Sequence, residues 1–477
     1  MLSVVIFLMI LTLYNCRLDE KDENPIPILT SISPSSKAVN MPSFTLTARG
    51  SGFIADSRIV YNDVELTTNF INSNTVSARI SSNKIKKNVN NVSGLNGKIH
   101  SVFIRNPEPG GGDSASLKLS ITYNHTFPGP LEIFETGHSY GNPVIAVDGK
   151  NKIYIIFENY NYQNKIYNIS VIKSVDYGKT WSKPQHLVEF DRKCYNPAIA
   201  IGSDGNVYVT FYVIKLYFMY LKNGESKWSP PRELTSDTNI PLKSALSVDR
   251  NNKVDIIWSQ SDNNYNNKIY YTNTMSSSMN FSTPVNIFKG WENYSLVSDL
   301  AISSDGDGNV YATWTSWPSG GSKYSHSVFN YSNDEGVTWG SPDKVFSVCS
   351  SSDMDVDPDG NIGLIVSSSY LPFRNQIVFY KSIDNGQSFG STVKITGGFN
   401  DYNPKISIDS VSNINVIFKL NKRYYYCRSI NKGKKWAAPF SIGNIGGGAD
   451  IALDKEGNVY VVSGHYSKLF FLRNSTD

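Results

Sequence analysis

Short segments in which apolar and polar residues alternate follow one another along almost the whole chain. Between residues 28 and 122 they read FTLTARGSGF, RIVYNDVEL, TVSARI, HSVFIRN and SLKLSI, and turns rich in Gly, Asn and Ser separate them. A period of two places alternate side chains on opposite faces of a β-strand. The pattern predicts about seven strands over 28–122, enough for a small β-sandwich.

A repeating pattern begins after residue 130. Seven units each contain an apolar strand, a polar turn and a second apolar strand: NPVIAVDGKNKIYIIF, NPAIAIGSDGNVYVTF, KSALSVDRNNKVDIIW, SDLAISSDGDGNVYATW, SDMDVDPDGNIGLIV, NPKISIDSVSNINVIF and ADIALDKEGNVYVV. Only six candidate outermost strands follow these units, whereas a seventh, LEIFE at 131–135, precedes the first unit. A β-propeller whose last blade is completed by the first strand has this arrangement. We therefore expect a seven-bladed propeller over 130–477, or a six-bladed one if one unit is misassigned.

A second repeat contains a polar hairpin motif. It reads SVDYGKTW (174–181), SNDEGVTW (332–339), SIDNGQSF (382–389) and SINKGKKW (429–436), with weaker versions at 221–228 and 274–281. The terminal aromatic residues lie 47 to 58 residues apart, the length of one four-stranded blade. These units resemble the Asp-box (BNR) repeat of sialidase-like propellers.

The Asp-box resemblance implies a structural role for the motif. In that family the box is the hairpin between the third and fourth strands of a blade. Ser and Asp hydrogen-bond the turn, Gly adopts a conformation that other residues resist, and the aromatic residue packs between sheets. The residues that this assigns to blade structure and not to catalysis are Ser174, Asp176, Gly178, Trp181, Ser332, Asp334, Gly336, Trp339, Ser382, Asp384, Gly386, Phe389, Ser429, Gly433 and Trp436.

The first domain also carries a family resemblance. ISPSS near its start, GSGF at 50–53 and NPEPGGGDSASLKLSI near its end look like an IPT/TIG immunoglobulin-like domain. The resemblance implies a spacer or contact surface over 28–122 and not a catalyst. Residues 123–129 are then a linker to the propeller.

The N-terminus indicates export. MLSVVIFLMILTLYNC contains an apolar run shorter than the roughly 20 residues that span a bilayer, which suits a signal peptide. Its end resembles a bacterial lipoprotein signal, with Leu13 three residues before Cys16, which implies cleavage and lipidation at Cys16. Residues 1–16 would be the signal and 17–27 a flexible tether that holds the protein at the outer membrane or cell surface. Plain secretion is the alternative.

Composition narrows the function classes. Aromatic residues make up 13% of the chain, charged residues 18%, and the net charge is +4 without a basic tract, which argues against nucleic acid as a partner. Apart from Cys16, three cysteines remain, an odd number that cannot all pair within one chain. Disulfides are therefore not expected to hold the fold.

Stacking the seven inner strands on their apolar positions predicts which residues face the channel. With Ile145, Leu300 and Met354 aligned, the preceding row reads Val144, Ala198, Ala245, Asp299, Asp353, Lys405 and Asp450, and Asp355 lies one layer deeper. Tyr140, Tyr195 and Tyr402 precede three of these strands and are predicted to line the rim as stacking platforms. We interpret the cluster as solvated channel charges, as a sugar-binding mouth, or as a Ca²⁺ site formed by Asp299, Asp353 and Asp450. The loops SSDGDGN and DVDPDGN look calcium-like but also suit the tight turns of the repeat.

Function has to be inferred from the site, because the fold serves many chemistries. A sialidase uses three arginines, a Tyr/Glu pair and an Asp, and none of these is recognisable; the first blade opens with HSYGNP, which contains no Arg. We therefore expect a surface or secreted protein that binds carbohydrate or an extracellular macromolecule, and exo-sialidase activity is disfavoured. The alternative is a glycoside hydrolase that uses two of the carboxylates. The sequence predicts no cofactor beyond the Ca²⁺ alternative.

Overall fold

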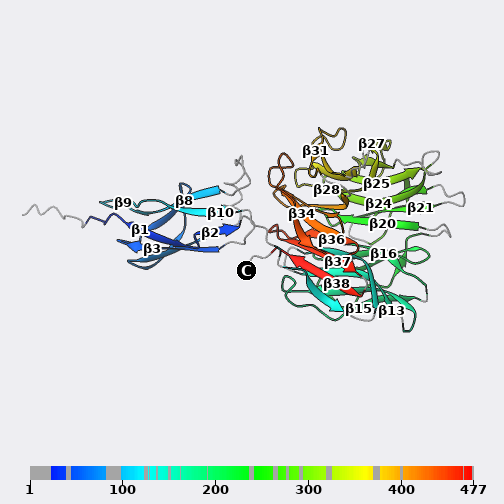
Figure 1. The fold of residues 1–477 in the computed structure, drawn as a ribbon, viewed down its shortest axis with the longest axis horizontal. Helices are drawn as coiled ribbons and strands as arrows, with labels where there is room; N and C mark the ends of the chain where they lie inside the picture. Colours follow the sequence, from blue (N-terminus) through cyan, green and yellow to red (C-terminus); the bar gives the residue numbers. More distant parts are fainter. Residues whose placement is uncertain are drawn as a thin grey trace, which may run out of the picture. The chain divides into compact units, whose positions relative to one another are not determined.

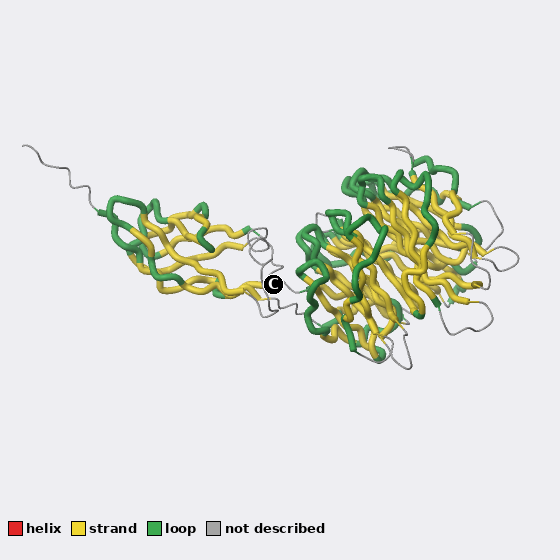
Figure 2. Tube along the Cα trace, turned by 90° about the horizontal axis from the view of Figure 1, so that it is seen from above, coloured by secondary structure: helices red, strands yellow, loops and turns green. Residues whose placement is uncertain are grey.

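The computed structural model describes residues 23–38, 44–81, 98–122, 127, 129–135, 138–148, 152–161, 163–190, 192–235, 241–261, 267–274, 279–288, 294–318, 325–368, 376–397, 401–465 and 467–474. Within these ranges the regular elements are β-strands (Figure 2). Nowhere in them does a helix occur with the length and apolar character needed to cross a membrane. The chain divides into two compact units, Met1–His125 and Thr126–Ser475. Residues 1–22, which include the predicted signal and Cys16, lie outside the described residues.

The first unit contains two β-sheets (Figure 1). One sheet has the strand order β1 (Ile28–Ser33), β3 (Phe44–Ser51), β7 (Thr75–Ile80), β6 (Thr68–Asn72). The other has the order β2 (Ser36–Ala38), β10 (Leu117–Thr122), β8 (Lys98–Asn106), β4 (Arg58–Tyr61), β5 (Val64–Glu65), and β9 (Gly112–Asp113) also pairs with β8.

Alternate residues of these strands form the core of the first unit. Leu46 and Ala48 on β3, Val76 on β7 and Val102 and Ile104 on β8 are completely buried. Because side chains alternate between the faces of a strand, one face of each sheet is apolar and the two faces pack together. The unit is a β-sandwich, as the alternation predicts.

The second unit is a propeller of seven four-stranded antiparallel sheets, which we number as blades in chain order. The innermost strands of blades 1 to 7 are β12 (His138–Val147), β16 (Tyr195–Ile201), β20 (Pro241–Val248), β24 (Tyr294–Ser304), β28 (Cys349–Val356), β32 (Asp401–Ile408) and β36 (Ala449–Leu453). The second strands are β13 (Ile153–Asn161), β17 (Val207–Tyr212), β21 (Val254–Ser261), β25 (Val310–Pro318), β29 (Ile362–Ser368), β33 (Ile414–Leu420) and β37 (Val459–His465).

The third and fourth strands complete the blades. The third strands are β14 (Ile166–Ser174), β18 (Leu216–Leu221), β22 (Asn267–Asn273), β26 (His326–Ser332), β30 (Gln376–Ser382), β34 (Arg423–Ser429) and β38 (Lys468–Arg473). The outermost strands of blades 1 to 6 are β15 (Gln185–Phe190), β19 (Arg232–Glu233), β23 (Val285–Phe288), β27 (Asp343–Ser347), β31 (Val393–Lys394) and β35 (Phe440–Gly443).

Blade 7 contains strands from both ends of the propeller sequence. Its outermost strand is β11 (Leu131–Glu135), which pairs antiparallel with β38 near the end of the chain. The pairing joins residues more than 330 positions apart and gives the last blade its fourth strand, so the two ends of the propeller sequence are held in one sheet. The seven-bladed prediction and its closing strand are confirmed, and the six-bladed alternative is wrong.

The polar hairpins join the third and fourth strands of blades 1, 4, 5 and 6. In the first, the Ser174 hydroxyl accepts the Gly178 N–H at 2.8 Å and donates to Asp176 Oδ1 at 2.7 Å, and Asp176 Oδ1 accepts the Thr180 N–H at 2.9 Å. Equivalent bonds hold the hairpins that contain Ser332, Asp334 and Gly336, and Ser382, Asp384 and Gly386. These bonds lie within each turn, and the hairpin of blade 4 also bonds outside it, where the Glu335 N–H donates to the Gly308 carbonyl at 2.8 Å.

The Gly and aromatic positions of each hairpin contact the preceding blade. Gly178 has φ +80°, and a Cβ atom there would lie 2.4 Å from the Phe471 ring of blade 7. The Trp181 ring packs edge-on against Phe471, with centroids 4.9 Å apart. Trp339 against Tyr271, Phe389 against Phe329 and Trp436 against Phe379 repeat the contact. The hairpins are thus tied into the packing between adjacent blades.

The loops with calcium-like sequences are tight turns between first and second strands. Asp305 Oδ1 accepts the Asp307 N–H at 2.8 Å and the Asn309 N–H at 3.2 Å, and Asp357 Oδ1 accepts the Asn361 N–H at 2.9 Å. These carboxylates replace backbone partners within the turn. The turn interpretation of SSDGDGN and DVDPDGN is the one that the hydrogen bonds support.

Candidate functional site

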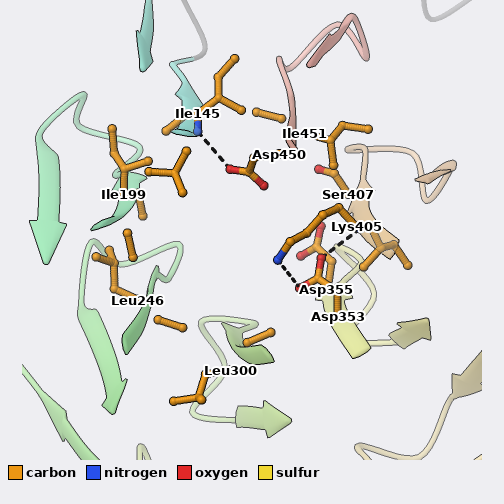
Figure 3. Close-up of a pocket in the computed structure, with 18 of the residues that line it drawn as sticks. Ile145, Ile199, Leu246, Leu300, Asp353, Asp355, Lys405, Ser407, Asp450 and Ile451 are labelled. Carbon is orange, nitrogen blue, oxygen red and sulfur yellow. Dashed lines mark hydrogen bonds and ion pairs between the residues drawn. The ribbon is translucent and has the colours of Figure 1, made fainter. Parts of the chain in front are cut away.

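A cavity of about 710 Å³ lies at the centre of the propeller. Its walls come from the innermost strands of all seven blades, and Figure 3 shows it with side chains from several of them. The innermost strands begin at one end of the channel, which we call the mouth. The first-to-second strand turns and the polar hairpins lie at the opposite end, the turn end, because first and third strands of a blade run in the same direction.

Pairing with the second strand defines which channel residues are equivalent. In blade 1, Val144 pairs with Ile156, the fourth residue of the second strand β13. In every other blade, one residue of the innermost strand likewise pairs with the fourth residue of the second strand. This row, which we call the channel row, consists of Val144, Ala198, Ala245, Ala301, Asp353, Lys405 and Asp450.

The pairing corrects one predicted position. Blade 4 has a β-bulge between Ser298 and Ala301, so Asp299 and Leu300 together lie opposite Trp314. Asp299 therefore stands two residues before the channel row, and the prediction that it shares the row with Asp353 and Asp450 is wrong. Matching apolar positions assumes an unbroken period of two, which a bulge interrupts.

The charged residues of the channel row link neighbouring blades. Asp450 Oδ2 accepts the backbone N–H of Ile145, and Asp353 Oδ2 accepts that of Ile406, each at 3.0 Å (Figure 3). The Lys405 ammonium lies 3.6 Å from the other oxygen, Oδ1, of Asp353. Each carboxylate thus bridges from its own innermost strand to the next one around the ring.

The charges of the channel row keep Lys405 protonated, and Lys405 in turn offsets part of the effect of burial on the neighbouring carboxyl groups. The Lys405 pKa is raised, first by the Asp353 charge, against the effect of burial, and also by Asp450 and Asp299. Burial raises the pKa of Asp353 and of Asp450, and Lys405 offsets part of that rise. Lys405 is consequently the internal counter-cation of the three acids.

Asp355 lies one layer below the channel row, towards the turn end. Its Oδ2 accepts the Ile408 N–H at 2.8 Å, and the Ser303 hydroxyl donates to Oδ1 at 3.4 Å. Burial raises the Asp355 pKa to about 7, although the hydrogen bonds oppose the rise. This carboxylate is therefore titratable near neutral pH.

A ring of residues at the mouth stands two positions before the channel row. We call it the mouth ring, and its members all line the cavity: Asn142, Asn196, Lys243, Asp299, Ser351, Asn403 and Gly448. Six of the seven carry polar side chains, in contrast to the Val and Ala that dominate the channel row. Sequence reasoning missed this ring, although the repeated Asn-Pro of blades 1, 2 and 6 was a visible signal.

Four members of the mouth ring share an uncommon backbone conformation. Asn142, Asn196, Asn403 and Asp299 have φ of 42°, 52°, 50° and 53°. Asn and Asp tolerate this left-handed region better than most residues, and each of the four lies in a β-bulge. The bulges turn these side chains towards the mouth at the point where strand pairing is interrupted.

Further contacts hold parts of the mouth ring in place. Glu158, which the sequence did not single out, accepts the Asn142 side-chain N–H at 2.7 Å and the Asn196 backbone N–H at 2.9 Å. Between blades 3 and 4, the Lys243 ammonium lies 3.8 Å from Asp299 Oδ1. The ring is therefore cross-linked from blade to blade.

The tyrosines occupy other positions than predicted. Tyr195 stacks edge-on against Tyr212 at 4.5 Å, Tyr402 lies under the Lys419 ammonium, and neither lines the cavity. The Tyr140 side chain lies outside the described residues. Tyr424, which the sequence did not indicate, does line the cavity, and its hydroxyl donates to the Gly447 carbonyl at 2.8 Å. The bulges that follow Tyr195 and Tyr402 change the direction of the strand, so these two tyrosines are not part of the cavity lining.

The predicted carboxylates Asp299, Asp353 and Asp450 do not gather into a cluster of metal ligands within the described residues. The described residues contain no group of three or more His, Cys, Asp or Glu that could hold a metal ion. The reason is visible in the channel row, where the Lys405 ammonium takes the place of a cation beside Asp353. This ion pair counts against a Ca²⁺ site at Asp299, Asp353 and Asp450, which stays a prediction.

Comparison with known proteins identifies the fold. No protein-family model matches the sequence, and no curated protein matches it. Among solved structures, an ulvan lyase bound to a saccharide of glucuronic acid and rhamnose 3-sulfate matches with a TM-score of 0.51 and 10% identity over 74% of this chain and 96% of that one. The Hadza microbial sialidase Hz136 matches with a TM-score of 0.42 and 10% identity over 83% of this chain and 76% of that one. A Penicillium chrysogenum α-L-arabinanase matches with a TM-score of 0.43 and 12% identity over 66% of this chain and 99% of that one. The likeness to the ulvan lyase supports the β-propeller fold of the second unit.

Proposed function

We propose that the propeller binds carbohydrate at the mouth of its channel. The observation that carries this proposal is the mouth ring, in which polar side chains from six blades surround one cavity. Amide, hydroxyl and charged groups are the partners that sugar hydroxyls require, and a cavity of about 710 Å³ is in the range of small-ligand sites. The similarly folded ulvan lyase, which was solved with a bound saccharide, adds support.

The contacts of the carboxylates favour binding over hydrolysis. A glycoside hydrolase needs one carboxyl as acid and another as base or nucleophile. Here, Asp353 and Asp450 each give one oxygen to a backbone N–H of the next blade, and Lys405 lies beside the other oxygen of Asp353. A purified propeller protein assayed against a panel of fluorogenic glycosides is expected to release no product. Turnover that disappears in Asp450→Asn would establish the hydrolase instead.

The binding proposal is tested by shortening mouth-ring side chains without straining the backbone. Asn196→Gly and Asn403→Gly remove an amide at positive φ, where Gly is equally comfortable. Binding to the best ligand of a glycan array should weaken about fivefold for each variant, the effect of losing about one hydrogen bond. Asn385→Gly is the matched control, because Asn385 also has positive φ (57°) but lies in a hairpin at the turn end. Equal affinities for all three variants would refute a site at the mouth.

We further propose that the protein is held at a bacterial surface. Cys16 at the end of the N-terminal apolar run supports lipidation, and the immunoglobulin-like unit, which resembles IPT/TIG domains in its sequence, would act as a spacer. Cys16→Ser should move the protein from the membrane fraction to the soluble fraction. Mass spectrometry that finds a mature chain beginning after residue 16 would support secretion without an anchor.

A further inference from the structure

The charges that line the cavity have an excess of one sign. Its described lining includes four carboxylates, Asp299, Asp353, Asp355 and Asp450, and two ammonium groups, Lys243 and Lys405. With every group ionised the sum is 2 − 4 = −2. No arginine is among these lining residues, although Arg is the residue best suited to a carboxylate or sulfate ligand because it binds both oxygens of the group.

Both lysines already have carboxylate partners. Lys243 lies 3.8 Å from Asp299 Oδ1, and Lys405 lies 3.6 Å from Asp353 Oδ1. An anionic ligand would have to compete with a carboxylate of the protein for either ammonium group. It would also leave that carboxylate without its counter-charge in a partly desolvated channel.

The three asparagines of the mouth ring are suited to bind hydroxyl groups and not anionic groups. Asn142, Asn196 and Asn403 offer amide groups that both donate and accept hydrogen bonds. Their backbone is held by bulges, and each is followed by a proline that restricts it further. Such pre-organised neutral dipoles suit hydroxyl groups, and they add no charge to offset an acidic ligand.

We propose that the mouth selects uncharged sugars and rejects sugars that carry carboxylate or sulfate groups. This inference rests on the proposed carbohydrate function and narrows its ligand class. It separates this site from that of the similarly folded ulvan lyase, whose bound saccharide carries both kinds of anionic group. Selection would come from the charge of the protein and not from a clash of shapes.

The test uses the purified protein and matched neutral and acidic ligands. Calorimetry would compare lactose with 3′-sialyllactose, and cellohexaose with the corresponding glucuronic acid hexamer, after a glycan array has covered other linkages. The neutral member should bind at least about tenfold more tightly, and raising the salt concentration should strengthen only the acidic member, because salt screens repulsion.

Asp299→Asn sharpens this test because it removes one negative charge from the mouth ring. The new asparagine is the residue that blades 1, 2 and 6 already carry at the equivalent position. The variant should raise the affinity for the acidic member of each pair about threefold or more relative to the affinity for its neutral partner. Asp307→Asn, at an exposed turn-end position of the same blade, is the control and should change neither.

Two outcomes would overturn the inference in distinguishable ways. Acidic ligands that bind more tightly than their neutral partners, with affinity that falls as salt rises, would refute the selection and leave carbohydrate binding intact. Failure of every glycan to bind would refute the proposed function itself and this inference with it.

Discussion

The two ends of the propeller differ in how strictly their residues repeat from blade to blade. At the turn end, four hairpins share the same Ser, Gly and aromatic positions, the same hydrogen bonds and the same contact with the preceding blade. At the mouth, equivalent positions hold Asn, Lys, Asp, Ser and Gly. The channel row beneath them changes from Val and Ala in blades 1 to 4 to Asp and Lys in blades 5 to 7.

The difference separates what the fold requires from what it permits. Every blade has to pack against its neighbours, so the residues that achieve this packing recur. Four blades form the same strand with an apolar residue in the channel row, which means that the fold does not need a charge there. Formation of the innermost strand therefore does not require the charged residues at these positions, and the following predictions test that division.

The largest expected loss of stability is at the turn end. Trp436→Ala removes a ring that packs 5.2 Å from Phe379 of the preceding blade, and we expect the free energy of unfolding to fall by about 3 kcal/mol. Chemical denaturation would measure it. Val337→Ala, on an equivalent hairpin but 70% exposed, is the control and should change little. Equal stability of the two variants would contradict a packing role for the motif.

Lys405→Ala is expected to lower stability by a smaller amount. The variant places in blade 6 the alanine that blades 2 to 4 have in the channel row, but it leaves Asp353 without its ammonium partner. Because Lys405 is about one-third exposed and Asp353 is buried, we expect a loss of about 2 kcal/mol, between the values for surface and buried pairs. The double variant Asp353→Ala with Lys405→Ala should recover most of that loss. A double variant as unstable as the sum of both single changes would mean that the fold does require these charges.

The pH dependence of stability should follow the buried acids. The folded state holds a proton on Asp355 up to about pH 7, and on Asp255 up to about pH 6, whereas these carboxyls ionise near pH 4 in the unfolded chain. The stabilisation from these raised pKa values is complete below about pH 4 and disappears as pH rises through 6 to 7. We therefore expect the melting temperature to fall between pH 5 and pH 8.

Asp355→Asn provides the control for this pH effect, because its amide does not titrate. Its melting temperature should change less between pH 5 and pH 8 than that of the parent. Asp176 and Asp384, whose pKa values hydrogen bonds lower to about 2, remain ionised throughout this range and do not contribute. A melting temperature that rises with pH in the parent protein would contradict the assignment of buried, proton-binding carboxyls.

The smallest effect is expected for Asp176→Asn. The equivalent residue of blade 6 is Asn431, whose Oδ1 accepts the Ser429 hydroxyl at 3.0 Å and the Lys435 N–H at 2.7 Å. The variant keeps these turn bonds and loses mainly the charge-assisted bond from the Thr180 hydroxyl. Thermal unfolding should show a cost of about 0.5 to 1 kcal/mol, and a loss as large as that of Trp436→Ala would show that the charge itself is required.

Much of the fold was predictable because it depends on local patterns. Alternation predicted the strands, the recurring Gly and aromatic positions predicted the blade hairpins, and LEIFE predicted the closing strand. Each of these signals is local or repeats at a fixed interval, so seven weak copies reinforce one another. Asp353, Lys405 and Asp450 were predicted to lie together for the same reason.

The remaining features of the site depended on distant parts of the chain meeting. The bulge that moves Asp299 out of the channel row, the bond from Ile145 to Asp450 across 305 positions, and the placement of Lys405 beside Asp353 follow from strand pairing and ring closure. A pattern of period two carries no information about where pairing is interrupted or which oxygen a backbone N–H reaches. The sequence by itself therefore determined the blades and their order, while only the tertiary structure decided which side chains meet at the mouth, because that depends on contacts between blades.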